Sequence, residues 1–272
     1  MKRIALGLAA ALVMGTALPA FATSEAWESI QFELYGERPT LSGDDFIAID
    51  APYRTKDDAR TRIAAQVVAP NGGAIDKVTV VLDENPMPVS AVFDLDDPRE
   101  SFYFDLTMRV NGPTPMHVVA EMTDGRLFVS ETFVKTSGTG ACSAPPGTDI
   151  EAALASLGNM QIDVTGRLKP MIGSLSQSFL NRQNRVGVDI SHPSHSGMQM
   201  DQISLLFIPL RYVETVDIDL DGGGYVEMTG SISLSENPRV GLAVPQNTQS
   251  LDVTMTDTDG TVSHAHKDLA GF

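Results

Sequence analysis

The stretch KVTVVLDENPMPVSAVFDL, residues 77–95, decides the fold class. Its first six residues are rich in β-branched side chains, which favour extended backbone. In its last part apolar residues recur at every second position, at Val89, Ala91, Phe93 and Leu95. This alternation gives a strand one apolar face. Asn85-Pro86 marks a turn between the two parts, because proline fixes its own φ and restricts the preceding residue.

Similar strand patterns recur along the chain, with turn residues between them. In the first half they cover 45–51, 62–68, 101–109, 117–122 and 126–134. In the second half they cover 186–190, 203–208, 212–220, 225–234, 251–255 and 262–266. The run at 203–208 is continuously apolar, which predicts a core strand. Hairpin signals at Asp124-Gly125 and Asp259-Gly260 support the pattern, and strands at such spacing are typical of β-sandwiches.

Two short segments have helical features instead. Apolar residues at helical spacing after Ser24 predict a short helix near the N-terminus that ends near Gly36. Farther along the chain, Asp149 can cap a helix that ends at Gly158.

The composition changes at Thr136, where a run without large side chains begins. The run SGTGACSAPPG at 137–147 has little to bury, which predicts a flexible linker or exposed loop. The strand–turn sequences LDENP (82–86) and LSENP (234–238) echo each other on either side of this run. We therefore expect an all-β protein with two β-sandwiches joined by a cysteine-containing linker. The expected boundaries are 23–136 for the first sandwich, 137–158 for the linker and short helix, and 159–272 for the second sandwich.

Residues 1–22 have the pattern of a secretory signal peptide. Lys2 and Arg3 precede an apolar run at 4–18, and Ala20-Phe21-Ala22 provides a cleavage site between small residues. The apolar run is short for a membrane span, and no later stretch is apolar enough to cross a bilayer. We expect a secreted, periplasmic protein without a membrane anchor.

The mature chain is strongly acidic. The full sequence has a net charge of −16, and removal of Lys2 and Arg3 with the signal peptide leaves −18. Such a chain repels nucleic acids and anionic membranes. The charge favours a basic protein partner. Solubility alone is an equally good explanation of the same charge.

Cys142 is the single cysteine of the chain, so no internal disulfide can form. In a secreted protein this pattern indicates intermolecular pairing or a free reactive thiol, or else a buried and inert cysteine. The immediate neighbours favour an accessible thiol, because all of them are small: Gly140, Ala141, Ser143 and Ala144. No cation lies close in sequence, and we expect an ordinary thiol pKa of about 8.5. This suits a covalent handle better than a catalytic nucleophile.

The sequence predicts no catalytic residue, cofactor or metal site. Two histidine pairs, His192/His195 and His264/His266, could bind copper or zinc weakly, and nearby methionines would suit Cu(I). Neither pair has a carboxylate or cysteine at a recognised ligand spacing. No sequence motif of a hydrolase, nucleotide-binding protein or metalloprotease is present.

Several segments together resemble the SoxY and SoxZ families. The SoxY resemblance lies in 77–93, with its Asn-Pro-x-Pro turn, and in the place of Cys142 after the last strand of the first domain. The SoxZ resemblance lies in ISHP (190–193), GM (197–198), FIP (207–209) and ISLSENP (232–238). The resemblance implies two immunoglobulin-like sandwiches that pair with each other.

The resemblance also implies a function. SoxY and SoxZ form a periplasmic sulfur carrier in which a SoxY cysteine holds intermediates as thiol conjugates for partner enzymes, and Cys142 matches that cysteine. Fused carriers of this kind are associated with quinoprotein dehydrogenases, so the implied partners are Sox-type enzymes or a quinoprotein dehydrogenase and its cytochrome. The cysteine of SoxY lies in a free glycine-rich tail, whereas here the chain continues through Pro145-Pro146 into a second domain.

Two other interpretations stay open at this point. The chain could be a non-covalent docking module for a dehydrogenase or cytochrome, with an incidental cysteine. It could also handle copper through its histidine and methionine residues.

Overall fold

The computed structural model describes residues 25–138, 141, 150–172, 183–201 and 204–269. The described part contains helices α1 (Glu25–Tyr35) and α2 (Ile150–Ala155) and the 3-10 turn η1 (Pro70–Gly72). Strands of the first half are β1 (Thr40–Ser42), β2 (Ile47–Asp50), β3 (Thr61–Val68), β4 (Ile75–Leu82), β5 (Val89–Arg99), β6 (Ser101–Met108), β7 (Thr114–Met122) and β8 (Leu127–Val134). Strands of the second half are β9 (Met160–Arg167), β10 (Gln183–Ile190), β11 (Val213–Leu220), β12 (Gly223–Thr229), β13 (Arg239–Pro245), β14 (Ser250–Asp257) and β15 (Val262–Asp268).

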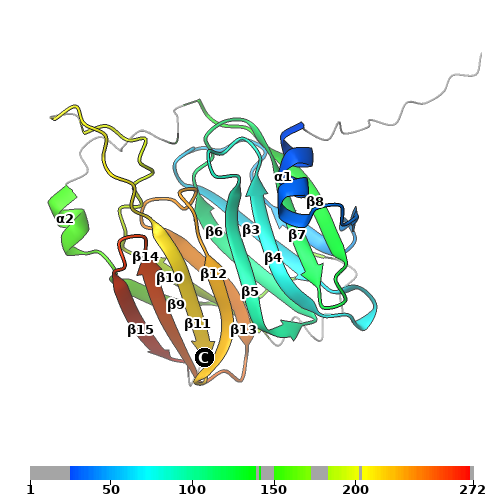
Figure 1. Ribbon diagram of the computed structural model, residues 1–272. Helices are drawn as coiled ribbons and strands as arrows, with labels where there is room; N and C mark the ends of the chain where they lie inside the picture. Colours follow the sequence, from blue (N-terminus) through cyan, green and yellow to red (C-terminus); the bar gives the residue numbers. More distant parts are fainter. Residues whose placement is uncertain (1–24, 139–140, 142–149, 173–182, 202–203, 270–272) are drawn as a thin grey trace, which may run out of the picture.

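These strands form two sheets that both run through the two halves of the chain (Figure 1). The larger sheet has the order β1-β8-β7-β4-β5-β12-β11-β14-β15, and the smaller has the order β2-β3-β6-β13-β10-β9. Each half therefore contributes strands to both layers, as a sandwich requires. The predicted all-β class with two sandwiches is confirmed.

The two sandwiches join edge to edge within one chain. β5 pairs antiparallel with β12, with Leu95 opposite Val226, and β6 pairs antiparallel with β13, with Leu106 opposite Val240. These pairings cover the strand edges that each half would otherwise expose. One hydrophobic core consequently extends through both halves.

Alternation along the strands accounts for this core. In β14 every second residue is buried, namely Leu251, Val253, Met255 and Asp257. In β5 the predicted apolar face is turned inward, where Phe93 lies 4.9 Å from Phe104 and 5.2 Å from Phe102 between ring centroids. The apolar face predicted for the last part of 77–95 therefore lies in the core, with Ala91, Phe93 and Leu95 buried.

β4 is buried over most of its length on both faces because α1 covers the outer side of the larger sheet (Figure 1). Trp27 of α1 packs among Val81, Val119 and Leu127 and stacks on the His117 ring at 3.9 Å between centroids. The His117 Nδ1 atom lies 2.9 Å from a carboxylate oxygen of Asp83. The N-terminal helix is therefore docked mainly through Trp27, with Ile30 and Tyr35 of the same helix packed against this cluster.

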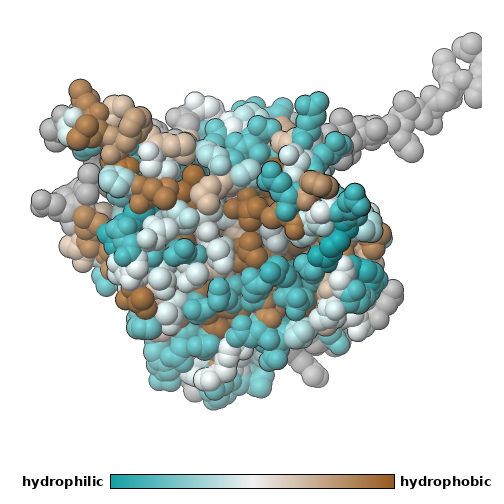
Figure 2. Space-filling model, in the orientation of Figure 1, coloured by the Kyte–Doolittle hydropathy of each residue, from teal (hydrophilic) through white to brown (hydrophobic). Residues whose placement is uncertain are grey.

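The predicted core strand at 203–208 is wrong. In the described part of this run, Leu205, Leu206 and Phe207 are 65–68% exposed, and Phe207 makes only an isolated bridge to Met200. Asp201 explains the difference, because its carboxylate accepts the backbone N–H of Ser204 and closes a turn that interrupts the extended backbone. Figure 2 shows apolar side chains gathered at the upper left, where this loop lies in Figure 1.

The predicted strand 225–234 also ends early, at Thr229. A Cβ on Gly230 would lie 2.6 Å from the Val213 carbonyl oxygen, and the Leu234 N–H closes a turn on the Ser231 carbonyl at 3.0 Å. The chain therefore turns here, and the segment after β12 lies against the end of β6 through the Met108–Leu234 bridge. Within the described residues, no helix has the length and apolar character needed to cross a bilayer.

Candidate functional site

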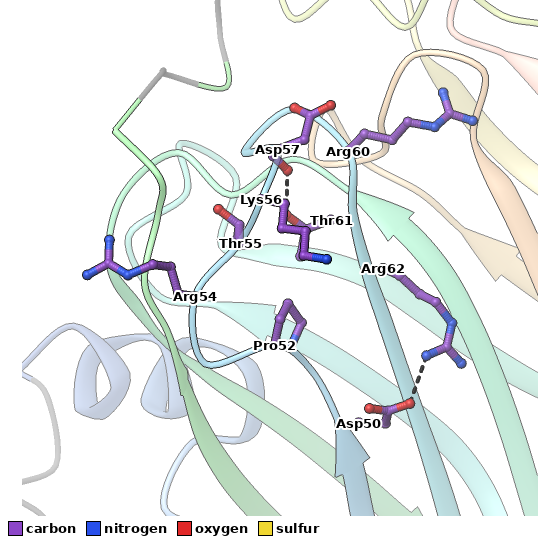
Figure 3. Close-up of a pocket in the computed structure, with 9 residues that line it drawn as sticks. All are labelled: Asp50, Pro52, Arg54, Thr55, Lys56, Asp57, Arg60, Thr61 and Arg62. Carbon is purple, nitrogen blue, oxygen red and sulfur yellow. Dashed lines mark hydrogen bonds and ion pairs between the residues drawn. The ribbon is translucent and has the colours of Figure 1, made fainter.

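The segment that leads from β8 toward Cys142 lies beside the loop between β2 and β3. The Thr55 N–H donates to the Lys135 carbonyl and the Lys135 N–H donates to the Tyr53 carbonyl, each at 2.8 Å. The Arg54 guanidinium donates to the Thr136 carbonyl at 3.2 Å. Figure 3 shows this segment as it passes Arg54 and Thr55. These bonds continue the regular backbone pairing of the chain beyond the end of β8.

A buried carboxylate then holds the next two residues. Asp58 is 0% exposed and accepts the backbone N–H of Ser137 at 2.6 Å and that of Gly138 at 3.1 Å. The Thr55 hydroxyl also donates to this carboxylate. We call Asp58 and Thr55, with the Ser137 and Gly138 N–H groups that they bind, the Asp58 clamp. It fixes the start of the predicted linker 137–158.

The local sequence shapes both sides of the clamp. The Asp57 carboxylate accepts the Ala59 N–H at 3.0 Å, and the Asp57 carbonyl accepts the Thr61 hydroxyl at 2.9 Å, so the loop turns tightly into β3. Gly138 has a φ of +96°, which favours glycine because a side chain would strain the backbone. Together these features aim two consecutive N–H groups at one carboxylate.

The clamp changes the acidity of Asp58. Burial acts to raise the pKa of this carboxyl, but hydrogen bonds from Thr55, Ser137 and Gly138 outweigh burial and lower the pKa to about 2. Asp58 is therefore ionised at any physiological pH. Its unfolded-state pKa is close to 3.8, so the clamp stabilises the folded state above that pH and loses this contribution as the pH falls toward 2.

We expect Asp58→Asn to destabilise the protein by about 2 kcal/mol at neutral pH, the value that corresponds to the lowered pKa. The amide cannot replace both acceptor oxygens. The difference in unfolding free energy between wild type and variant should shrink between pH 5 and pH 2. Urea unfolding across that range measures it. Asp57→Asn, in the same loop but exposed, is the matched control, and an equal, pH-independent loss in both variants would contradict the clamp.

Cys142 itself lies outside the described residues, as do three of the predicted flanking residues: Gly140, Ser143 and Ala144. The remaining flanking residue, Ala141, is 2% exposed, so the position just before the cysteine is buried against the protein. Cys142 follows Gly138 by four positions. The clamp therefore sets the point from which the cysteine-bearing segment departs.

Residues of the same loop line a cleft of about 360 Å³ (Figure 3). Four basic residues line it, namely Arg54, Lys56, Arg60 and Arg62. Two acidic residues, Asp50 and Asp57, also line it. We call this the basic cleft. It is a concentration of positive charge in a chain whose net charge is −16.

The structure does not bring the two histidine pairs together as metal sites. His264 contacts Thr254 at 2.9 Å, whereas His266 contacts Asp252 at 2.7 Å on an exposed strand. His195 contacts the Gln199 side chain at 3.0 Å. Among the described residues there is no group of three or more His, Cys, Asp or Glu arranged to hold a metal ion.

His192 instead belongs to a buried Ser–His–Asp arrangement. Its Nδ1 atom lies 3.2 Å from the Ser194 Oγ and accepts the Ser194 N–H at 2.9 Å, and its Nε2 atom lies 3.4 Å from Asp257. Burial lowers the pKa of His192 to about 4, so the imidazole is neutral. The three side chains are at most 1% exposed. A substrate cannot reach this serine in the folded state, and the arrangement stabilises the loop.

Sequence reasoning did not identify the Asp58 clamp or the basic cleft. The clamp joins residues about 80 positions apart, and no local pattern marks such a pairing. The cleft did leave a signal, because RTKDDARTR at 54–62 places four basic residues within nine positions of an acidic chain. A comparison of the charge of short sequence windows with the net charge of the whole chain identifies this basic run.

Two family models match the chain in tandem. The model "Sulfur oxidation protein SoxY" matches residues 31–142, and the model "Sulphur oxidation protein SoxZ" matches residues 178–268. No curated protein matches the sequence.

Among solved structures, the sulfur carrier protein SoxY from Chlorobium limicola f thiosulfatophilum is 21% identical, with 41% of this chain and 96% of that chain covered at a TM-score of 0.34. The β-glucuronidase of Parabacteroides merdae is 11% identical, with 82% of this chain but only 24% of that chain covered at a TM-score of 0.21.

Proposed function

This chain is a fusion of a SoxY-like domain and a SoxZ-like domain, and from that premise we propose that it is a sulfur carrier that holds its cargo on Cys142. The observation that carries the proposal is the end of the SoxY match. The match runs to residue 142, which is the single cysteine of the chain. A carrier needs one covalent attachment point, and the SoxY match includes this cysteine as its last residue, which supports the proposal.

The geometry before the cysteine supports a carrier. The Asp58 clamp fixes Ser137 and Gly138 at the edge of a rigid sandwich, and the cysteine follows four positions later. A short tether from a fixed point keeps the cargo at a high effective concentration near a docked partner.

Loading by thiol exchange balances without an outside oxidant. The Cys142 thiolate attacks the terminal sulfur of a persulfide donor such as glutathione persulfide, and a new S–S bond forms. The S–S bond of the donor breaks, and glutathione leaves as a thiolate with that electron pair. The carrier is left as a Cys142 persulfide, which a second enzyme can process.

The proposal assigns the chemistry to partner enzymes and the transport to this chain. SoxY and SoxZ are carrier or adaptor proteins, which agrees with the absence of enzyme motifs in the sequence. We further propose that the mature protein works in the periplasm, as its signal-peptide pattern indicates. Its partners would be Sox-type enzymes, or a quinoprotein dehydrogenase with its cytochrome.

A loading and unloading experiment tests the proposal. Purified mature protein is loaded with glutathione persulfide, freed of donor and incubated with periplasmic extract of its host, and intact mass follows the cargo over time. We expect the added sulfur to leave Cys142 faster in extract than in buffer. Equal rates in both would contradict a carrier that partners unload, and would favour the docking module with an incidental cysteine.

A further inference from the structure

The segment between β10 and β11 presents large apolar side chains to solvent. We call its described residues 195–201 and 204–211 the apolar arm. Leu205, Leu206 and Phe207 at its tip are 65–68% exposed, and Met200 and Leu210 are each 47% exposed. In Figure 1 this yellow segment extends away from the sheets at the upper left, where Figure 2 shows apolar side chains gathered. Exposed apolar surface of this kind marks interaction sites on soluble proteins.

The arm is a paired ribbon with a defined backbone. The Ile208 N–H donates to the Gln199 carbonyl at 2.8 Å, and the Asp201 N–H donates to the Leu206 carbonyl at 2.9 Å. The two passes of the chain therefore hold each other. A backbone that is already ordered loses little conformational freedom on binding, which favours affinity.

The tip of the arm holds a strained residue in the open. Leu205 has a φ of +58°, a left-handed conformation that disfavours bulky side chains. Its N–H donates to the Asp201 carbonyl at 2.9 Å, and the Asp201 carboxylate accepts the Ser204 N–H at 2.6 Å and the Ser204 hydroxyl at 2.7 Å. The side chain of Leu205 is 68% exposed, so burial within the chain does not compensate the strain. Strain that the surrounding bonds maintain in this way is typical of functional segments.

The base of the arm is fixed to the second sandwich. The Arg211 Nε atom donates to the Asp257 carboxylate and an Nη atom donates to the Thr261 hydroxyl, each at 2.8 Å. Asp257 is 0% exposed, and the Arg211 N–H donates to the His195 carbonyl at 3.0 Å. The tip is therefore presented from a rigid base on the β14–β15 hairpin.

Charge selects what the arm can contact. The described arm contains one acidic and one basic side chain, those of Asp201 and Arg211, and each is bonded within the protein. An uncharged complement therefore fits the tip better than a basic or an acidic one. The net charge of −16 repels anionic membranes and further copies of the same chain. A projecting apolar tip on such a chain fits a groove on a different protein.

We propose that the apolar arm docks into an uncharged, apolar groove of a partner protein, with Leu205, Leu206 and Phe207 as the side chains that enter the groove. Removal of these side chains from water supplies the affinity. Salt screens charges and has little effect on such a contact. That this partner is the enzyme that unloads Cys142 rests on the proposed function, whereas the apolar contact itself does not.

Photo-cross-linking followed by titration of the full mature protein tests the arm. A photoreactive phenylalanine analogue in place of Phe207 identifies the partner in host cells, and the same analogue in place of Phe32, which is 63% exposed on α1, controls for chance contacts. With that partner purified, Leu206→Ser should weaken binding by about tenfold or more. Leu41→Ser, at an exposed leucine of β1, should leave the affinity unchanged. The wild-type affinity should be the same at low and high salt, and urea unfolding checks that both variants are folded.

The outcomes separate the arm from the carrier. Cross-links from position 207 to a second copy of the chain or to lipid, or none beyond those from position 32, would overturn the docking arm. Equal affinities in Leu206→Ser and Leu41→Ser would overturn it as well, and so would binding that salt abolishes, because that result indicates docking by charge. A partner that binds through the arm but leaves a loaded Cys142 unchanged would contradict the proposed function alone.

Discussion

Cys142→Ser removes all covalent loading and leaves the unfolding free energy of the protein within about 0.5 kcal/mol of wild type. The chain has no other thiol that could accept cargo. A serine hydroxyl cannot replace the thiolate, because it is not ionised at neutral pH and forms no S–S bond. Intact mass after treatment with glutathione persulfide measures loading, and urea unfolding measures stability.

The matched control is Ser143→Ala, which changes the neighbouring side chain and keeps the thiol. It should load as fully as wild type. A host strain carrying Cys142→Ser should lose the sulfur-oxidation function of the protein, whereas the Ser143→Ala strain keeps it. A Cys142→Ser strain with wild-type function would show that the cysteine is incidental and that the protein acts by docking.

Arg109→Ala destabilises the protein by about 3 to 5 kcal/mol, because hydrogen bonds from a buried charged group are lost and the missing side chain leaves a cavity. Arg109 is 3% exposed and lies where the two sandwiches meet. Its guanidinium donates to the Leu234 carbonyl at 2.7 Å and to the Ile232 carbonyl at 3.2 Å. Its own carbonyl accepts the Asn85 amide at 2.9 Å. Without the side chain, two buried carbonyls lose a donor and a cavity remains.

Urea unfolding of the whole chain tests this prediction. Arg126→Ala, at the exposed β7–β8 hairpin, should cost less than about 1 kcal/mol, because its ion pair with Asp124 lies at the surface. Arg109→Lys keeps the charge but not the planar group that reaches two carbonyls, and should fall between the two. Equal stability in Arg109→Ala and Arg126→Ala would show that the junction does not depend on this network.

Local patterns predicted the strands well where one sheet face is buried. The alternation in 89–95 and 251–255 places its apolar residues in the core, as β5 and β14 show. The same reasoning was wrong at 203–208. Hydropathy could not distinguish a core strand from an exposed apolar loop there, because the turn depends on one hydrogen bond from Ser204 to Asp201.

Contacts between residues far apart in the sequence could not be predicted from local patterns. The echo LDENP and LSENP suggested two related sandwiches, but it did not show that their edges pair through β5–β12 and β6–β13. The bond from Asn85 to Ser233 at the junction spans 148 positions. The Asp58 clamp likewise depends on a loop and a segment that only the folded chain brings together.

The role of Cys142 as carrier residue is a prediction that rests on its uniqueness and its small neighbours. A single cysteine in a run of small residues after the last strand of a domain is visible without a structure, and the SoxY match ends at that position. What the structure adds is the rigid start of the segment and the basic cleft beside it. Both depend on the β2–β3 loop, whose sequence marks the basic residues but not the contacts that the loop makes with the segment after β8.

The most direct test of the carrier is the intact mass of the protein purified from the periplasm of its host, with and without reductant. We predict a population with added mass on Cys142 that reductant removes, and the increment identifies the sulfur cargo. A single unmodified species, identical with and without reductant in cells that actively oxidise sulfur compounds, would contradict the claim that Cys142 carries cargo.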